Sequence, residues 1–229
     1  HGTGAWLALG IRYTDRRAFI PSNNCHRPTD LPAGRDHPHR RKWYNALPMP
    51  PVSESGPQDA LIGRILECVK ELLPLQDLDS LLRRGVELAR QKLGVERCSL
   101  WLLDFDGVTL RGTYGTDMQG ATTDEHGSHF KVAELENDLP RPLAELDGWT
   151  IKTNGKRISW TEFGEQDNGE GWNSVIPVHG PDGQVGCLFQ DAAITNRPLD
   201  PHQQDLMTVY CSLLGQIAGR RLAESRESI

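Results

Sequence analysis

Two histidines and two carboxylates stand close together in the stretch RGTYGTDMQGATTDEHGSHF, which begins at residue 111. His126 and His129 are three residues apart, next to Asp124 and Glu125, and one helical turn at this spacing would present two imidazoles to a metal ion. A glycine between the histidines disfavours a rigid helix, and the spacing supplies no third ligand. We therefore expect solvated loop residues, with contact to an organic ligand as the alternative, and no metal site.

Cysteines are the other candidates for chemistry, because a thiolate acts as a nucleophile or as a metal ligand. The five cysteines are Cys25, Cys68, Cys98, Cys187 and Cys211. Their wide spacing, without a C-x-x-C pair, favours reduced thiols over a disulfide framework or a zinc site. Two of them lie in strand-like runs and two in helix-like runs, where a small buried hydrophobic side chain is the usual role.

Charge is distributed unevenly along the 229 residues, whose formal net charge is −6. Residues 1–51 hold eight Lys and Arg against three Asp and Glu, whereas the rest has 17 basic and 28 acidic residues. An acidic body repels phosphate backbones and anionic lipid headgroups, so we expect it to bind neither nucleic acid nor membrane. No apolar run approaches the roughly 18–20 residues of a membrane span. Together with reduced thiols, this indicates a cytoplasmic protein.

The segment 1–51 is expected to be a disordered tail rich in proline and arginine. It contains seven of the 15 prolines, and its apolar residues follow no period. The first methionine is Met49, so one explanation is that the natural protein starts there and the preceding residues are not native sequence. A basic arm for nucleic acid is the other explanation, based on RDHPHRRKW. The predicted domain covers 52–222, and 223–229 begins a linker helix.

Helical periodicity begins near residue 58 and is ended by Pro74. A second helix is predicted after Asp77, a suitable N-cap, and it ends before Gly94, where a left-handed residue is needed. The last helix opens at Asp200-Pro201 and runs to the chain end without a stop signal. Such an ending is typical of a chain cut inside a longer protein.

Strand periodicity occupies the region between these helices. VERCSLWLL and VTLRGTY form one expected hairpin, WTIKTNGKRISW offers strands around an Asn-Gly turn, and NSVIPVHG pairs with QVGCLFQDAAI across PDG. VAELENDLPRPLAEL predicts one or two short helices interrupted by its prolines. This order predicts an α+β fold whose terminal helices lie together on one face of an antiparallel sheet.

The ordered series of these segments resembles a GAF domain over residues 58–222. The resemblance is carried by LDSLLRRGVELARQKLGVERCSLWLLD, VTLRGTYG, VIPVHGPDGQVGCLFQDAA and PLDPHQQDLMTVYCSLLGQIAGRR. It implies a PAS-like fold in which a six-stranded antiparallel sheet carries the terminal helices on one face and a ligand pocket on the other. It also implies a non-enzymatic sensory module of a bacterial-type signalling protein, with a downstream output domain such as a histidine kinase in the same polypeptide.

The resemblance makes the glycine-rich stretch a wall or lid of that pocket, because the stretch leaves the sheet after its second strand. The side chains that we expect at the ligand are Arg111, Tyr114, Thr116, Asp117, His129, Trp149, Trp160, Trp172 and Asp191. The tryptophans would either stack on a planar ligand or cover the sheet as core residues. The identity of the ligand stays open.

Three functions of relatives are weighed against the residues of this chain. A covalent chromophore is not expected, because the only Cys-His pair, Cys25-His26, lies in the tail. The cyclic-nucleotide signature is matched only in part, by Asn196-Arg197. A methionine sulfoxide reductase would need loop cysteines, which the domain lacks. A structural dimerisation domain without a ligand is the remaining alternative.

The terminal helices are expected to form a parallel homodimer. The residues predicted to form the dimer seam are Leu61, Ile65, Leu206, Tyr210, Leu213 and Ile217. Their spacings are typical of a helical apolar stripe. Ligand binding would then move the last helix and alter a downstream domain.

Overall fold

The computed structural model describes residues 57–161 and 164–227, so the predicted tail lies outside the described residues. The helices are α1 Pro57–Leu72, α2 Leu78–Gln91, α3 Val132–Glu136, the short 3-10 helix η1 Leu143–Glu145, and α4 Pro201–Glu227. The strands are β1 Arg97–Leu103, β2 Thr109–Thr116, β3 Thr122–Asp124, β4 His129–Lys131, β5 Thr150–Thr161, β6 Gly164–Gly180 and β7 Gly183–Asp191.

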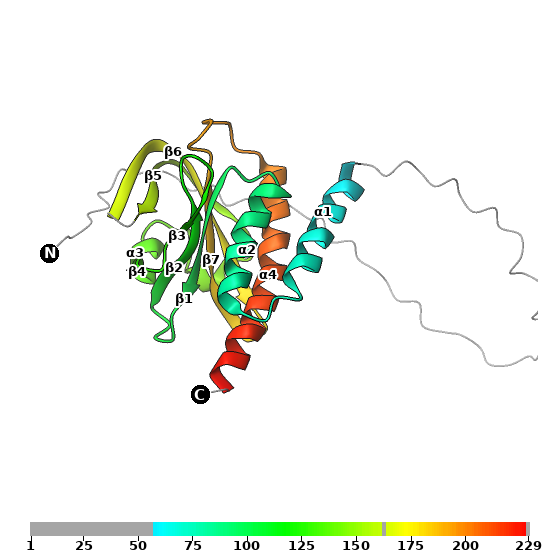
Figure 1. Cartoon of the computed structure of the whole chain (residues 1–229). Coiled ribbons are helices and arrows are strands. Elements are labelled where there is room, and N and C mark those ends of the chain that lie inside the picture. Colours follow the sequence, from blue (N-terminus) through cyan, green and yellow to red (C-terminus); the bar gives the residue numbers. More distant parts are fainter. Residues whose placement is uncertain (1–56, 162–163, 228–229) are drawn as a thin grey trace, which may run out of the picture.

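Within the described residues, seven strands form one antiparallel sheet in the order β3-β2-β1-β7-β6-β5, and β4 also pairs with β2 (Figure 1). β4 pairs with the first half of β2 and β3 with the second half, so two short strands share one edge. The resemblance implied six strands. The difference arises in the glycine-rich stretch, which pairs with β2 twice instead of leaving the sheet.

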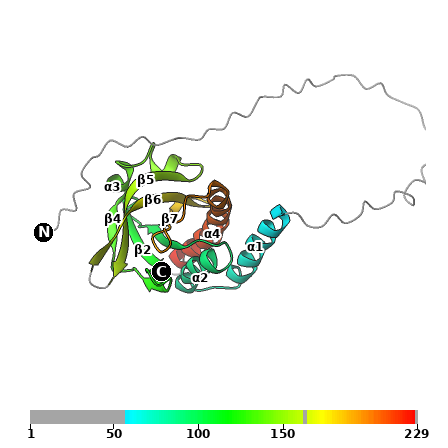
Figure 2. The same ribbon diagram turned by 90° about the horizontal axis from the view of Figure 1, so that it is seen from above.

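Three long helices lie together on one face of the sheet, and α3 lies on the opposite face (Figures 1 and 2). The core between helices and sheet includes Leu81, Leu100, Ile176, Leu188, Met207, Tyr210 and Leu214. This arrangement confirms the α+β prediction with the terminal helices on one side. None of the helices in the described part of the chain is both long enough and apolar enough to cross a membrane.

Local signals in the sequence place several of the element ends. Asp77 is the N-cap of α2, and its carboxylate accepts a hydrogen bond of 2.8 Å from the Ser80 N–H. Gly94 has a φ of +72°, as the predicted left-handed position after the helix requires. The turn between β6 and β7 consists of Pro181 and Asp182, followed by Gly183 at a φ of +123°.

The predicted Asn-Gly turn in WTIKTNGKRISW is wrong, because β5 runs through it without reversal. The pairing of β5 with β6 shifts register between Lys152 and Gly155, so the dipeptide forms an irregularity within the strand. A Cβ atom at Gly155 would overlap the side-chain amide of Asn173 on β6. Glycine at this position therefore permits the close approach of two strands.

The middle of α4 approaches the β6–β7 hairpin closely through glycines. A Cβ atom at Gly215 would overlap the backbone of His179, and one at Gly219 would lie 2.8 Å from the Cδ of Pro181. The Gln216 side chain donates a hydrogen bond of 3.2 Å to the His179 carbonyl. α4 is thus held directly against β6 and β7, the strands whose other face is turned away from the long helices.

Candidate functional site

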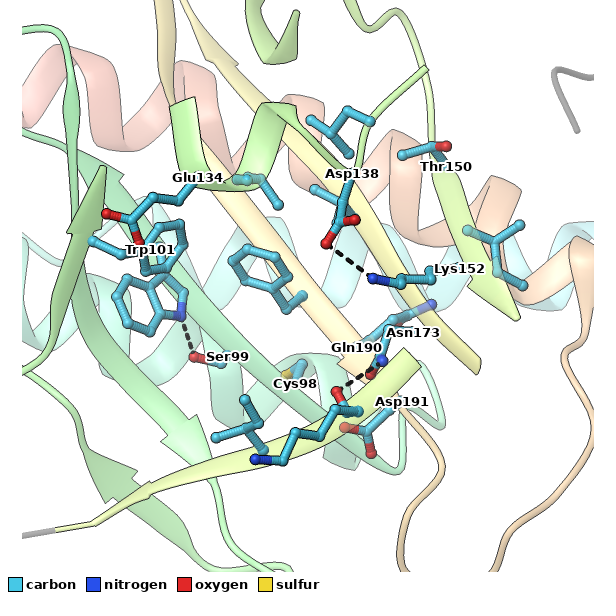
Figure 3. A pocket seen from close by; sticks show the side chains of 18 of the residues that line it. Cys98, Ser99, Trp101, Glu134, Asp138, Thr150, Lys152, Asn173, Gln190 and Asp191 are labelled. Carbon is cyan, nitrogen blue, oxygen red and sulfur yellow. Dashed lines mark hydrogen bonds and ion pairs between the residues drawn. The ribbon is translucent and has the colours of Figure 1, made fainter. Parts of the chain in front are cut away.

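A cavity of about 600 Å³ lies on the sheet face that faces away from the long helices. β1, β5, β6 and β7 contribute its floor, and the β4–α3 segment with the following turn contributes its opposite wall (Figure 3). Its lining includes Arg97, Ser99, Trp101, His129, Phe130, Leu135, Asp138, Leu139, Lys152, Lys156, Asn173, Val175, Phe189 and Asp191. Cavities of this size are typical of sites for small organic molecules.

Aromatic side chains form one side of the cavity. The ring centroids of Trp101 and Phe130 are 4.8 Å apart, and Phe189 lies 6.2 Å from Trp101 in an edge-to-face arrangement. The rings come from β1, β4 and β7, and they belong to a second apolar cluster on this face of the sheet. Such a surface favours a planar or apolar group of a ligand.

Ion pairs surround the polar side of the cavity. Lys152 Nζ lies 2.9 Å from an Asp138 oxygen, an interaction visible in Figure 3, and Lys156 Nζ lies 3.5 Å from Asp167. The lining contains four Lys or Arg and four Asp or Glu residues, so its formal charge is balanced. This balance disfavours a ligand that carries several charges of one sign.

A buried arginine joins the sheet to the part of β5 that borders the cavity. Arg97 donates a hydrogen bond of 2.9 Å from Nη2 to the Ile158 carbonyl on β5, and its Nε lies 3.7 Å from an oxygen of Asp191. Both side chains are almost fully buried. Desolvation raises the pKa of Asp191, and the nearby Arg97 guanidinium opposes part of that shift.

Glu125 is a buried acid next to the cavity floor, in contact with Ser99 of the lining. Its carboxylate accepts a hydrogen bond from Ser99 Oγ, and Ser99 Oγ accepts one of 2.6 Å from Trp101 Nε1 (Figure 3 shows the second bond). Only 4% of the residue is exposed. Desolvation raises the pKa of Glu125 to about 7, although the hydrogen bond from Ser99 and the charge of Arg97 oppose this shift.

The other face of the same strands contacts α4. Ser174, which lies between the cavity-lining residues Asn173 and Val175, donates a hydrogen bond of 2.7 Å to Gln204 Oε1. Gln190 Nε2 also donates to this oxygen, and Gln204 is completely buried. Successive residues of β6 therefore contact the cavity and the last helix in alternation.

Among the nine residues expected at a ligand, His129 and Asp191 line the cavity. Tyr114 points toward the helices instead, where its hydroxyl donates to Asp79 at 2.7 Å. The Trp149 indole donates to Asp205 at 2.8 Å, and the Trp172 indole donates to the backbone at position 197. These three aromatic residues join the sheet to the helices and to the loop before α4.

Three more of the expected residues, Arg111, Thr116 and Asp117, also lie away from the cavity lining. Arg111 is exposed and pairs with Asp104 at 2.6 Å, while the Asp117 carboxylate accepts backbone hydrogen bonds in the turn between β2 and β3. Thr116 is buried and accepts a long hydrogen bond of 3.4 Å from the Cys98 N–H. The side chain of Trp160 lies outside the described residues.

The glycine-rich stretch contributes less of the pocket wall than expected. Within it, His129 and Phe130 line the cavity, and the wall then continues through α3 to Leu139. Both ring nitrogens of His126 lie near carboxylates, at 2.8 Å from Asp124 and 3.2 Å from Asp79. Pairing with β2 holds the stretch in place. The backbone N–H and C=O groups of β3 and β4 form hydrogen bonds with β2, whereas those of a loop would bond to solvent.

Part of the predicted dimer seam is buried within the chain itself. Tyr210 is fully buried and its hydroxyl donates a hydrogen bond of 2.8 Å to the Gly85 carbonyl, and Ile65 and Ile217 also belong to the core. These residues are corrected to core positions, because one apolar stripe of α4 packs against α1, α2 and the sheet. Leu61 and Leu206 are half-buried, and Leu213 is exposed.

The four described cysteines, Cys68, Cys98, Cys187 and Cys211, are free and buried. Desolvation raises the pKa of Cys68 to about 11 and that of Cys98 to about 12. It raises the pKa of the other two thiols as well. A reactive thiol has the opposite properties, since it is accessible and has a lowered pKa.

Sequence reasoning did not identify Trp101, Phe130, Phe189 or Lys152 as lining residues, nor Glu125 as a buried acid. The alternation in β1 was a usable signal, because Ser99 and Trp101 occupy one face of the strand and Leu100 the other. No comparable signal exists for Glu125, which lies in a polar turn between two three-residue strands.

Solved structures with the same fold include phytochromes and the GAF domain of a phosphotransferase. Bacteriophytochrome RpBphP3 from the photosynthetic bacterium R. palustris is 16% identical with a TM-score of 0.55, over 78% of this chain and 41% of that chain. The GAF domain of a phosphoenolpyruvate-protein phosphotransferase from Coxiella burnetii is 14% identical with a TM-score of 0.55, over 73% of this chain and 97% of that domain. The phycoerythrobilin-bound GAF domain of a cyanobacterial phytochrome is 14% identical with a TM-score of 0.52, over 73% and 97%.

These similarities establish the fold. At this level of sequence identity, they establish no function for this chain. The chain spans 41% of the length of the bacteriophytochrome, whereas it spans nearly the whole of the isolated domains. A search of curated protein sequences finds no match to this chain. The model of the GAF domain family matches residues 77–217, from the N-cap of α2 into the second half of α4. This chain therefore belongs to the GAF domain family.

Proposed function

We propose that this GAF domain senses a small molecule and relays its binding through α4 to an output domain, such as a histidine kinase, in the same cytoplasmic polypeptide. The observation that carries the proposal is a cavity of about 600 Å³ whose floor strands contact α4 on their other face. The size and the mixed aromatic and polar lining suit an organic molecule. On this proposal the chain itself has no enzymatic activity.

The route from cavity to helix is short. β6 presents Asn173 and Val175 to the cavity and Ser174 to Gln204 of α4, so a displacement of this strand changes the contact with the helix. The glycine contacts at Gly215 leave little free space to absorb such a displacement. A coupling free energy of about 1–3 kcal/mol is typical of linkage between two sites in one protein.

Homodimerisation through the helices is part of this proposal. α1 exposes Ile62 and Leu66 at 57% and 53%, and α4 exposes Val209 and Leu213 at 51% and 36%. An apolar stripe of this kind on two helices suits a second copy of the chain in a parallel bundle. In the proposed dimer seam, this exposed stripe replaces Ile65, Tyr210 and Ile217, which are buried in the core.

Native mass spectrometry of the full chain purified from its host tests the sensor proposal. We expect a retained small molecule in the wild-type protein and its loss in Leu139→Trp, which fills the cavity from a half-buried position in its wall. An empty wild-type protein whose cavity also accepts no compound from a metabolite extract would favour the structural dimerisation role instead.

Analytical ultracentrifugation tests the dimer. We expect a monomer–dimer equilibrium in the wild-type chain and a shift to monomer in Leu66→Glu and Val209→Glu. Val108→Glu is the matched control, since this valine is 52% exposed but lies in the β1–β2 turn, away from α1 and α4. A wild-type chain that stays monomeric at high concentration would contradict the dimer.

A further inference from the structure

Glu125 occupies a notch that β2 opens with two glycines. A Cβ atom at Gly115 would overlap the Glu125 carboxylate, and one at Gly112 would overlap its backbone carbonyl. The Glu125 N–H donates a hydrogen bond of 2.9 Å to the Thr113 carbonyl, which anchors the residue on β2 between β3 and β4. The sheet is therefore shaped to hold this side chain, which would otherwise extend into solvent as most glutamates do.

The notch directs the carboxylate to the cavity floor. Ser99 donates its hydroxyl hydrogen to Glu125, and its oxygen accepts from the Trp101 indole at 2.6 Å. Both Ser99 and Trp101 line the cavity, and Trp101 is part of the aromatic side. A chain of two hydrogen bonds thus runs from the buried acid to two groups that a ligand would contact.

The protonation state of Glu125 decides which partner donates the hydrogen in the bond between Glu125 and Ser99. When the carboxylate is ionised, it has no hydrogen to give, so Ser99 must donate to it. When the carboxyl group is protonated, its own O–H is able to donate to Ser99 Oγ, which also accepts from Trp101. The hydroxyl hydrogen of Ser99 is then free to rotate into the cavity and to bind an acceptor there.

We propose that Glu125 is the proton-responsive residue of this cavity and controls whether Ser99 offers its hydroxyl hydrogen to a ligand. The proposal rests on the proposed function, since it specifies how that same cavity binds. The ligand of this cavity has an aromatic or apolar part that contacts Trp101 and a hydrogen-bond acceptor that faces Ser99. Glu125 touches no ligand itself, so it acts as a positioning residue.

The charged surroundings of Glu125 allow it to change state near neutral pH. Arg97 on β1 is the cation that favours its ionised form, and Asp124 in its own turn disfavours that form. Arg97 also pairs with Asp191 on β7, so two acids share one cation. β2 presents Gly112 and Gly115 to Glu125, and burial raises the pKa of its carboxyl to about 7.

The expected effect on binding follows from the protonated fraction. With a pKa of about 7, the protonated form accounts for roughly 90% of the protein at pH 6 and roughly 10% at pH 8. If an acceptor ligand binds only the protonated form, its apparent affinity falls about tenfold between these pH values. A ligand of the same shape without an acceptor has no such dependence.

Two measurements on the full chain test the proposal. The first follows the indole Nε1–H signals by nuclear magnetic resonance from pH 5 to pH 9, with Trp101 assigned through Trp101→Phe. We expect the Trp101 signal to titrate near pH 7 in the wild type and to stay constant in Glu125→Gln and in Ser99→Ala. Trp149, which donates to Asp205, is the internal reference that should not follow this titration.

Three variants separate Glu125 from neighbouring groups. Glu165→Gln removes another acid of the cavity lining, and His126→Gln and His129→Gln remove the two nearby imidazoles. We expect the Trp101 titration to persist in all three. A Trp101 signal that is constant in the wild type, that titrates in Glu125→Gln, or that stops titrating in a histidine variant overturns the proposal.

The second measurement compares acetophenone with α-methylstyrene, which has nearly the same shape but replaces the carbonyl acceptor with a methylene group. We expect acetophenone to bind about tenfold more weakly at pH 8 than at pH 6, a dependence that Glu125→Gln abolishes, and α-methylstyrene to bind equally at both. The proposal is overturned if both compounds lose affinity equally between pH 6 and pH 8, or if neither compound loses affinity. If neither compound binds while a host molecule is retained, only this inference fails. If no molecule of any kind occupies the cavity, the proposed function fails as well.

Discussion

The substitution Glu125→Gln should change how the stability of the domain depends on pH. Glutamine has nearly the same shape as glutamate, so it fits the notch against Gly115, and its amide donates to Ser99 as a protonated carboxyl would. The substitution therefore removes a titrating group from a buried position with little change in packing. The remaining effect is the linkage between proton binding and folding.

The sign of this linkage is the reverse of the usual case for an acid, because folding raises the pKa of Glu125 from its ordinary value of 4.5 to about 7. Below pH 4.5 both states are protonated, and the full stability is present. Between pH 4.5 and 7 the unfolded chain loses the proton first, so the free energy of unfolding falls. Above pH 7 the loss is complete and amounts to about 3 kcal/mol.

Urea unfolding of the full chain at intervals from pH 4.5 to pH 8.5 measures this loss. We expect the free energy of unfolding of Glu125→Gln to increase relative to the wild type by about 3 kcal/mol across this range. The difference between the two proteins cancels the titration of other groups that they share. Glu165→Gln, at an exposed position, should run parallel to the wild type. Parallel profiles for Glu125→Gln and the wild type would refute the reasoning.

Further substitutions test the packing and the thiols. Gly215→Ala should lower the free energy of unfolding by about 1–3 kcal/mol, because its Cβ meets the His179 backbone. Gly63→Ala on α1, with open space around it, should raise this free energy by about 1 kcal/mol, and equal effects of the two changes in urea unfolding would contradict the model of close approach. Tyr210→Phe should cost about 1 kcal/mol by removing the donor to the Gly85 carbonyl, and no change in urea unfolding would count against that bond. In Cys25→Ser, the thiol reagent 5,5′-dithiobis(2-nitrobenzoate) should react with the four remaining cysteines only as the protein unfolds, and rapid reaction of the native protein would contradict their burial.

The sequence determined the three long helices and the β1–β2 and β6–β7 hairpins with their order, because the signals for them act over a few residues. The Asp77 cap, the left-handed Gly94 and the turn before Gly183 each require a residue type that the local backbone geometry demands. The predicted turn at Asn154-Gly155 is wrong, because glycine is not specific to turns. Glycine also permits two strands to approach closely, and the letters alone do not distinguish that use from a turn.

Only the tertiary structure decided which side chains share the cavity. Period-two alternation separates Ser99 and Trp101 from Leu100, but it does not say which face the helices cover. Tyr114 was assigned to the pocket and lies on the helix side for this reason. Glu125 acquired its burial from two glycines on β2, a strand that it meets through antiparallel pairing. Its environment is set by groups distant along the chain, so no pattern local to residue 125 encodes it.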